Sequence, residues 1–283
     1  METAIVTDST CDLPREIAKE NDIHVIPLYV HFGEKEFKDG VDLTTGDFYS
    51  KVTDSDLLPR TSQPSVGDFV KFYENLADDY DNIISLHISS LMSGTYESAC
   101  LAAERIDDCN VIPVDTNTVS LGLGFLALKA ARLCKEEYPA EVVENMIKEA
   151  CKKLTIYFTV GELKYLKENG RIGKAQAFLG SILSINPILQ VKDGEVHPYQ
   201  KVRGSRKTFA RMKELLIENL EDSDVIYTGT LTGGAEQEKY TDKLNNKMED
   251  YEEVKIVNTR VGPVVGSHSG PNVYGFVILR GQN

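Results

Sequence analysis

Short apolar runs alternate, along the first half of the chain, with longer segments in which apolar residues recur at helical spacing. Runs of strand character lie at residues 4–6, 23–32, 83–88 and 111–114, and helical patterns cover residues 96–105 and 119–138. Strands that are apolar throughout are typical of a parallel sheet with helices on both faces. The pattern therefore predicts an α/β fold.

The pattern changes near residue 155. A β run at 155–160 is followed by a hairpin at 186–202, in which Asp193-Gly194 is the turn. Helical patterns at 205–220 and 235–248 then alternate with strand patterns at 225–227 and 254–257. We expect two α/β domains: an N-terminal domain (1–155) with a mainly parallel sheet flanked by helices, and a C-terminal domain (156–283) with a mixed sheet and helices.

Composition narrows the classes of function. The formal net charge is −13, from 31 Lys and Arg against 44 Asp and Glu. Such a surface is repelled by phosphate backbones, so nucleic-acid binding is not expected. Five cysteines without CxxC spacing argue against a disulfide framework and a zinc site. With neither a basic leader nor an apolar run of about 18 residues, we expect a cytoplasmic protein without membrane insertion, metal or cofactor.

Small hydroxyl residues gather in three loops, at residues 7–10, 60–65 and 89–95. Each loop ends a strand or leads into a helix, and such loops meet at one edge of a parallel sheet, where helix N-termini offer unpaired N–H groups. In the third loop Ser93 adds a hydroxyl donor, and Gly94 lets the backbone approach a ligand. The loops predict a site for a small anion. An ordinary serine-rich helix cap explains the third loop without a ligand.

Three further segments are candidates for a site. Basic residues cluster at 169–174 and 201–207, which suggests an anionic ligand or partner, although solvated charge is commoner. The segment 260–271 is rich in Gly and Pro, so its His268 is expected to be held by backbone turns. The apolar stretch 178–185 fits the lining of a tunnel, but a core helix running into a strand is its default explanation.

Ordered segments across nearly the whole chain resemble motifs of the DegV family. They lie at residues 6–14, 61–65, 89–95, 114–116, 163–173 and 262–271. Members of that family are two-domain α/β proteins that bind a long-chain fatty acid, and some present its carboxylate to a fatty acid kinase for phosphorylation. The resemblance therefore implies a fatty acid between the two domains and a kinase as partner.

Matched to the family's motifs, Thr61 and Ser93 are expected to hydrogen-bond the carboxylate. Ser62, the Gly94 amide and His268 are expected as close neighbours. The last motif departs slightly from the family pattern, because it carries Ser and Asn at positions where Thr or Gly is common.

Two arginines and three apolar residues complete the expected site. Arg171 and Arg203 resemble family residues near the pocket mouth, which assist the anion or engage the partner. For the acyl chain, the stretch 178–185 offers Phe178, Leu179 and Ile182.

Two enzymatic alternatives stay open. Ser93, His268 and Asp115 are the residue types of a serine acyl hydrolase, although Ser93 does not lie in a G-x-S-x-G motif. Asp8 follows a strand, as the nucleophile of a phosphotransfer enzyme does. Its next acidic neighbour, Asp12, is four residues on rather than the usual two, and no P-loop pattern is present.

Overall fold

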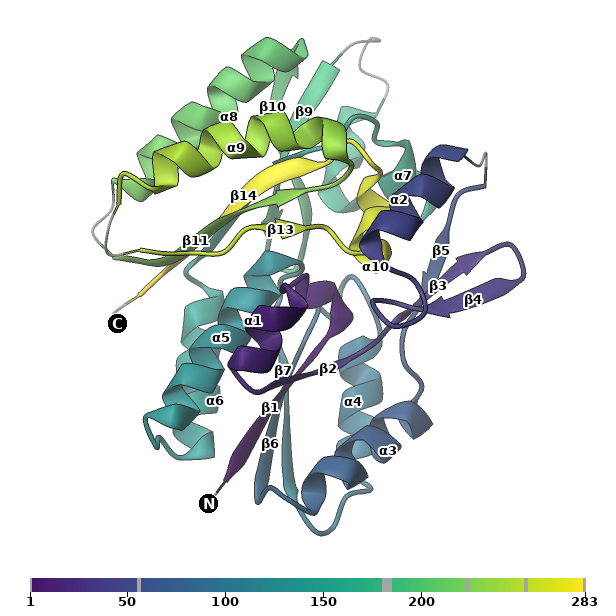
Figure 1. The fold of residues 1–283 in the computed structure, drawn as a ribbon, viewed down its shortest axis with the longest axis vertical. Helices are drawn as coiled ribbons and strands as arrows, with labels where there is room; N and C mark the ends of the chain where they lie inside the picture. The colour runs from purple at the N-terminus through teal and green to yellow at the C-terminus, as the bar shows by residue number, and fades with distance from the viewer. Residues whose placement is uncertain (1, 55–56, 180–184, 222–223, 252–253, 282–283) are drawn as a thin grey trace.

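Two β-sheets facing each other organise the chain (Figure 1). The structure is a computed structural model that describes residues 2–54, 57–179, 185–221, 224–251 and 254–281. The predicted boundary at residue 155 falls inside a strand, and the division into two domains stays a prediction. The predicted α/β class, with one parallel and one mixed sheet, is confirmed.

The first sheet has four parallel strands, in the order β2 (Ile23–Ile26), β1 (Thr3–Asp8), β6 (Asn82–His87) and β7 (Asn110–Asp115). Successive side chains of a strand point to opposite faces of the sheet, and helices cover both faces. Alternate side chains therefore pack against different helix layers. Helices α3 (Val66–Ala77) and α4 (Thr95–Ala103) cover one face. The other is covered by α1 (Arg15–Glu20), α5 (Leu121–Lys135) and α6 (Ala140–Cys151).

The expected single strand at 23–32 is wrong. The chain leaves the parallel sheet after Ile26 and enters a small antiparallel sheet at Tyr29. Pro27 lies between the two strands, and it has no N–H to donate to a ladder. The small sheet has the order β4 (Lys35–Lys38), β3 (Tyr29–Phe32) and β5 (Arg60–Ser62).

The mixed sheet is formed by the second half of the chain. Its order is β10 (Glu195–Arg203), β9 (Ile185–Lys192), β8 (Leu154–Thr159), β14 (Tyr274–Arg280), β11 (Val225–Thr232) and β12 (Lys255–Ile256), with β13 (Thr259–Arg260) also paired to β11. Helices α8 (Ser205–Leu220) and α9 (Glu238–Met248) cover its outer face. The predicted hairpin and its Asp193-Gly194 turn are confirmed.

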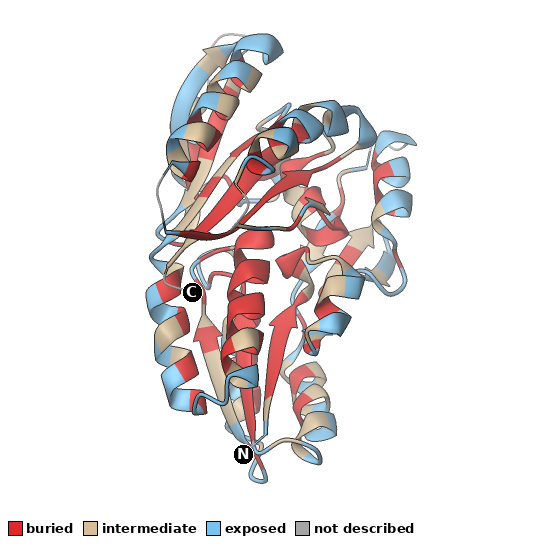
Figure 2. Ribbon diagram, turned by 60° about the vertical axis from the view of Figure 1, so that its left-hand side comes forward, coloured by how far each residue is buried: buried red, intermediate tan, exposed pale blue. Residues whose placement is uncertain are grey.

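Helix α5 is buried between the two large sheets. Phe125 stacks on Tyr227 of β11, while Leu121, Leu123 and Leu126 belong to a core that includes residues of both sheets. Figure 2 shows the buried residues concentrated in this helix and in the strands on either side of it. Among the described residues, no helix is both long and apolar enough to cross a membrane.

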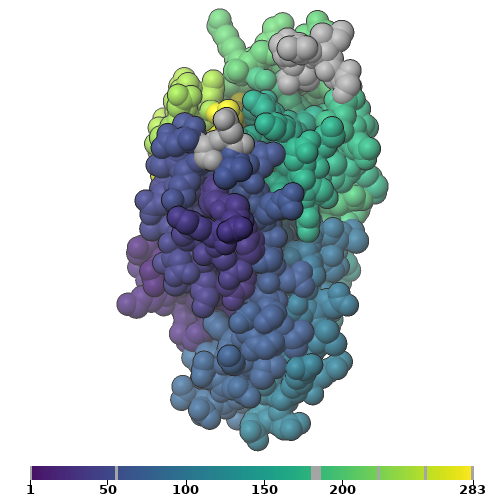
Figure 3. Space-filling model, turned by 90° about the vertical axis from the view of Figure 1, so that its right-hand side faces the viewer, coloured from purple at the N-terminus to yellow at the C-terminus, as the bar shows by residue number. Residues whose placement is uncertain are grey.

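A short helix near the end of the chain packs on the N-terminal third. Helix α10 (Pro263–Ser269) shares a small core with α2 (Thr45–Asp54) and β3, next to α7 (Lys164–Glu168). Short 3₁₀ helices at Ser9–Cys11, Gly173–Phe178 and Ala235–Gln237 complete the described elements. Figure 3 shows the N-terminal residues, purple to blue, lying directly against later ones in teal and green.

Two buried carboxyl groups from the N-terminal half hold the start of α10. Asp12 accepts hydrogen bonds from the Gly262 N–H (2.8 Å) and from the Ser120 hydroxyl. Asp39 accepts from the Val264 N–H and from a serine hydroxyl. Helix α1 begins at Arg15 without a side-chain cap, because the Asp12 carboxylate is directed at α10 instead.

These two carboxyl groups make stability depend on pH. Burial raises the pKa of Asp12 to about 8, against the opposing effect of its hydrogen bonds, and raises the pKa of Asp39 to about 7. In the unfolded chain both groups titrate near 3.8. The folded state therefore binds more protons, and its stability falls as pH rises through these folded pKa values.

We expect the free energy of unfolding, measured with urea, to fall by about 1–3 kcal/mol between about pH 6.5 and 8. Asp12→Asn resembles the protonated carboxyl and keeps an acceptor for Gly262, so it should flatten this dependence. His268 opposes this trend only weakly in this window, because its ordinary pKa is 6.5 and its folded pKa is lower, so most of its opposing effect falls below pH 6.5. Equal pH dependence in the variant and the wild type would contradict the assignment.

Candidate functional site

The cavity of interest lies where the parallel sheet reverses its direction of winding. From β1 the chain goes to β2 on one side, while β6 pairs with β1 on the other, so the carboxyl ends of β1 and β6 are adjacent. Ligands bind at such switch points in open α/β sheets. Thr10, just beyond β1, and Ile88, Met92 and Ser93, beyond β6, all line the cavity.

The cavity contains about 950 Å³ of space between the parallel sheet, the mixed sheet and α10. Most of its lining is apolar, formed by Leu28, Ile88, Met92, Val119, Ile156, Phe158, Leu166, Val191, Val196, Leu231, Val261, Val264, Val265 and Val273. The polar lining consists of Thr10, Thr61, Ser62, Gln63, Ser93, Ser120, Arg171, His268 and Ser269.

Two of the lining hydroxyl groups have their protons committed to the protein. The Thr10 hydroxyl donates to Asp8 (2.5 Å), and the Ser269 hydroxyl donates to the Val265 carbonyl (3.0 Å). A hydroxyl has one proton, so these two groups offer a ligand acceptor lone pairs only. They are poor partners for an anion.

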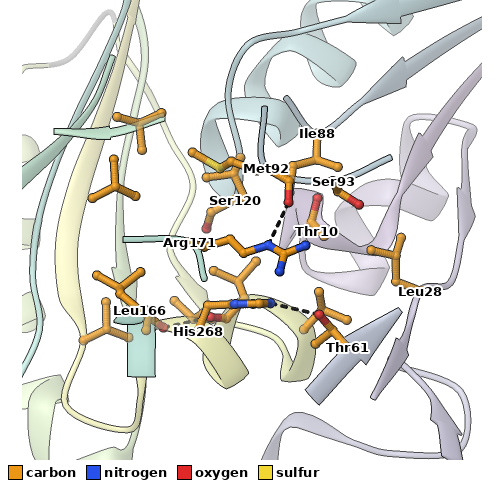
Figure 4. A pocket seen from close by; sticks show the side chains of 18 of the residues that line it. Thr10, Leu28, Thr61, Ile88, Met92, Ser93, Ser120, Leu166, Arg171 and His268 are labelled. Atoms are coloured by element: carbon orange, nitrogen blue, oxygen red, sulfur yellow. Dashed lines mark hydrogen bonds between the residues drawn. The ribbon is translucent and has the colours of Figure 1, made fainter. Parts of the chain in front are cut away.

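Thr61 and His268 form a pair that keeps one proton available. Thr61 lies on β5 and His268 on α10, and Oγ1 and Nε2 are 2.9 Å apart (Figure 4). Burial, with a smaller contribution from the Arg171 charge, lowers the pKa of His268 to about 4, so the imidazole is neutral at physiological pH. Hydroxyl and neutral ring together carry two protons, and their mutual bond uses one. When Nε2 carries the ring proton and donates it to Thr61, the Thr61 hydroxyl proton is free to bind a ligand acceptor.

Ser93 has the same property. Its hydroxyl lies 2.8 Å from the hydroxyl of Thr95, which is fully buried and does not line the cavity. When Thr95 donates to Ser93, the Ser93 proton is directed to the cavity. Gly94 is the N-cap of α4, and a Cβ there would lie 2.6 Å from the Gln63 side chain. The glycine therefore allows β5 and α4 to approach.

Arg171 adds positive charge between these two hydroxyl pairs. Its Nε donates to the Met92 carbonyl (3.0 Å) and its Nη1 to the Asn169 carbonyl (2.8 Å). Figure 4 shows the guanidinium group between Ser93 and the Thr61–His268 pair. Both of these partners are neutral carbonyls, so they leave its positive charge uncompensated. One end of the cavity thus combines a cation with two hydroxyl pairs, an arrangement suited to a carboxylate.

The geometry does not favour the enzymatic alternatives. Asp115 bonds the Ser90 hydroxyl (2.5 Å) and the Asn117 N–H (3.0 Å), and His268 Nδ1 has no hydrogen-bond partner among the described residues. A serine hydrolase needs its base oriented by a third group. Asp8 is fully buried and accepts hydrogen bonds from Thr10 and the Ile88 N–H, so it is inaccessible to a phosphoryl donor.

The cavity brings together several of the residues expected from the sequence. Thr61, Ser62, Ser93, Arg171 and His268 all line it, and Ser62 is exposed and bonded to a histidine of β3. The expectation that turns hold His268 is wrong, because it lies in α10. Its neighbours supplied the missed signal, since Gly followed by Pro often begins a helix.

Other expected residues lie outside the cavity. Gly94, Phe178 and Leu179 are not among its described lining residues, and Ile182 lies outside the described residues. Phe178 instead contacts the Lys201 ammonium group, 4.9 Å from its ring centre. Arg203 ends the edge strand β10, is exposed and is not among the described lining residues, so its expected assistance to the anion is not supported by the lining. Its expected partner contact stays a prediction.

The sequence argument missed most of the apolar lining. Its valines come from α10, the hairpin β9–β10 and the segments that precede α5, α10 or β14. No local pattern links these segments, because only the packing of the two sheets brings them together. Gln63 was also missed, although it lies within a hydroxyl cluster; its amide donates to Ser98 of α4 (3.1 Å).

Comparison with known proteins agrees with the resemblance drawn from the motifs. A family model described as "Uncharacterised protein, DegV family" matches residues 2–281. Protein DegV of Bacillus subtilis (strain 168) is 37% identical over 280 residues, which cover 98% of each chain. The crystal structure of DegV from Bacillus subtilis, described as a fatty acid binding protein, has a TM-score of 0.91 at 35% identity, covering 99% of this chain and 100% of that one. A Thermus thermophilus structure, described as showing fatty acid binding of a DegV family protein, has a TM-score of 0.91 at 32% identity with the same coverage. This chain belongs to the DegV family.

Proposed function

We propose that this protein binds one long-chain fatty acid, with the carboxylate at Thr61 and Ser93 and the acyl chain in the apolar part of the cavity. The observation that carries the proposal is the pair of uncommitted hydroxyl protons beside Arg171, at one end of a cavity that is otherwise apolar. His268 supports Thr61 from within the site. The descriptions of the Bacillus and Thermus relatives as fatty acid binding proteins point the same way.

The energetics of the cavity suit a carrier. Burial of roughly 14 methylene groups at ~0.8 kcal/mol each contributes about 11 kcal/mol before ordering costs are subtracted. The acyl chain therefore supplies most of the affinity, and the hydroxyl groups mainly fix the orientation of the head group. Each hydrogen bond to a charged group adds about 1.5–3 kcal/mol.

The same arrangement supports a role in presenting the carboxylate to a fatty acid kinase in the cytoplasm. Ser62 and Arg171 line the polar end of the cavity and are exposed, so a carboxylate bound there lies near the surface. Hydroxyl donors hold the carboxylate without a buried ion pair, which leaves its oxygens reactive toward a phosphoryl donor. A serine hydrolase is the less favoured alternative, since His268 lacks an orienting carboxylate among the described residues.

Mass spectrometry of the denatured protein should reveal about one co-purified long-chain fatty acid per chain. The expected result follows from the cavity volume and its apolar lining. Protein that carries no lipid and also fails to bind added palmitate or oleate would rule out the proposal. Release of free acid from an added fatty acyl ester would instead favour the hydrolase.

Thr61→Val combined with Ser93→Ala should weaken palmitate binding roughly 100- to 10,000-fold, because two hydrogen bonds to a carboxylate are lost. Binding of methyl palmitate, which has no anionic head group, should change much less. Ser269→Ala is the matched control, since this serine lines the same cavity with its proton committed to Val265. An equal loss in the control would show that the hydroxyl assignment is wrong.

A bacterial fatty acid kinase supplied with ATP and the palmitate-loaded protein should form acyl phosphate, which hydroxylamine traps as a hydroxamate. The Thr61→Val, Ser93→Ala variant should support less product at equal lipid loading, because the carboxylate is no longer oriented. Product formed no faster than with free palmitate would argue against presentation, while leaving lipid binding intact.

A further inference from the structure

A second hollow adjoins the acyl cavity and shares two residues with it. Ile156 of β8 and Val191 of β9 line both spaces. The second hollow is a groove of about 1880 Å³, open to solvent, that runs past the carboxyl end of β7, the end of α6 and the start of β8. Most of its lining residues are polar or charged, and its three lysines (Lys148, Lys152, Lys192) are balanced by three acids (Asp115, Glu149, Asp193). An apolar cavity and a polar groove thus meet at two aliphatic side chains.

Packing holds these two side chains in place. Ile156 is 4% exposed, and its Cδ1 would lie only 2.7 Å from a Cβ at Gly122, so it fills the space against α5. Val191 pairs across the hairpin with Val196, which lines the acyl cavity but not the groove. Loss of either wall residue would join the two spaces, whereas loss of Val196 would only enlarge the cavity.

Ile156 and Val191 lie on different secondary-structure elements from the residues of the proposed head-group site. Thr61, Ser93 and His268 come from β5, the start of α4 and α10. Ile156 and Val191 belong to the mixed sheet, and Figure 4 shows strands of that sheet bordering the side of the cavity opposite Thr61. A fatty acid with its carboxylate at Thr61 therefore directs its methyl end toward the mixed sheet.

We propose that Ile156 and Val191 form the end wall of the acyl site and make it select acids with an apolar terminus over acids with a second polar end. The inference rests on the proposed function and adds the selectivity of the same site. A second carboxylate at the wall would be desolvated without a partner, which is strongly unfavourable. In a chain without the wall it would reach the groove, where water solvates it.

The test compares palmitate with hexadecanedioate, which has the same chain length and a second terminal carboxylate. Both compete against a fluorescent fatty acid on the delipidated protein. The wild type should prefer palmitate by about 100-fold or more, because a charge buried alone is so costly. Ile156→Ala with Val191→Ala should reduce the ratio of the palmitate affinity to the hexadecanedioate affinity by about tenfold or more. Val191→Ala alone should reduce this ratio less.

The matched control is Ile88→Ala with Val196→Ala, which removes the same atoms from residues that line the acyl cavity alone. It should leave the preference near the wild-type value. The proposal is overturned if the wild type binds hexadecanedioate as tightly as palmitate, or if the wall and control variants show equal ratios. Failure of palmitate itself to bind the wild type would overturn the proposed function instead, and this inference with it.

Discussion

Burial of α5 on both sides is the constraint on which the other contacts depend. A helix that packs against two sheets must let each approach closely, and its two glycines meet this need. A Cβ at Gly124 would lie 2.9 Å from the Cys11 carbonyl oxygen, and one at Gly122 would meet Ile156. The helix begins just after Ser120, which has a φ of 57° and lines the cavity. The packing of α5 thereby sets the spacing of the sheets and the width of the site between them.

The site combines two kinds of interaction that tolerate change differently. In the proposed complex, apolar contacts with the acyl chain would be many and individually small, so most lining positions should accept a similar aliphatic residue. The polar end depends on which hydroxyl protons are free. Thr61 and Ser93 can each donate a proton to a ligand only when the neighbouring His268 or Thr95 donates to the hydroxyl oxygen. A neutral His268 is part of this arrangement, and its burial keeps it neutral. The head-group region is therefore the more sensitive part of the site.

Local sequence patterns predicted the features of the fold that depend on residues close together in the chain. Helix α8 was predicted to the residue, because its apolar spacing is regular and Gly204 precedes it. The hydroxyl clusters alone indicated an anion site, and the family motifs singled out Thr61, Ser93 and Arg171, all of which line the cavity. Their roles toward a ligand stay a prediction. The valine lining and the distance of Arg203 from the cavity could not be predicted, since both depend on how the two sheets pack.

The position of β14 has a consequence for the order in which the protein assembles. This last strand lies in the middle of the mixed sheet, between β8 and β11, and α10 precedes it directly. During synthesis, β8 and β11 emerge from the ribosome long before the strand that joins them. Until then the mixed sheet is in two parts, His268 cannot hydrogen-bond Thr61, and the lining of the cavity is incomplete. If the protein binds a fatty acid as proposed, loading must follow synthesis of the C-terminal strand, because an incomplete nascent chain lacks the closed cavity.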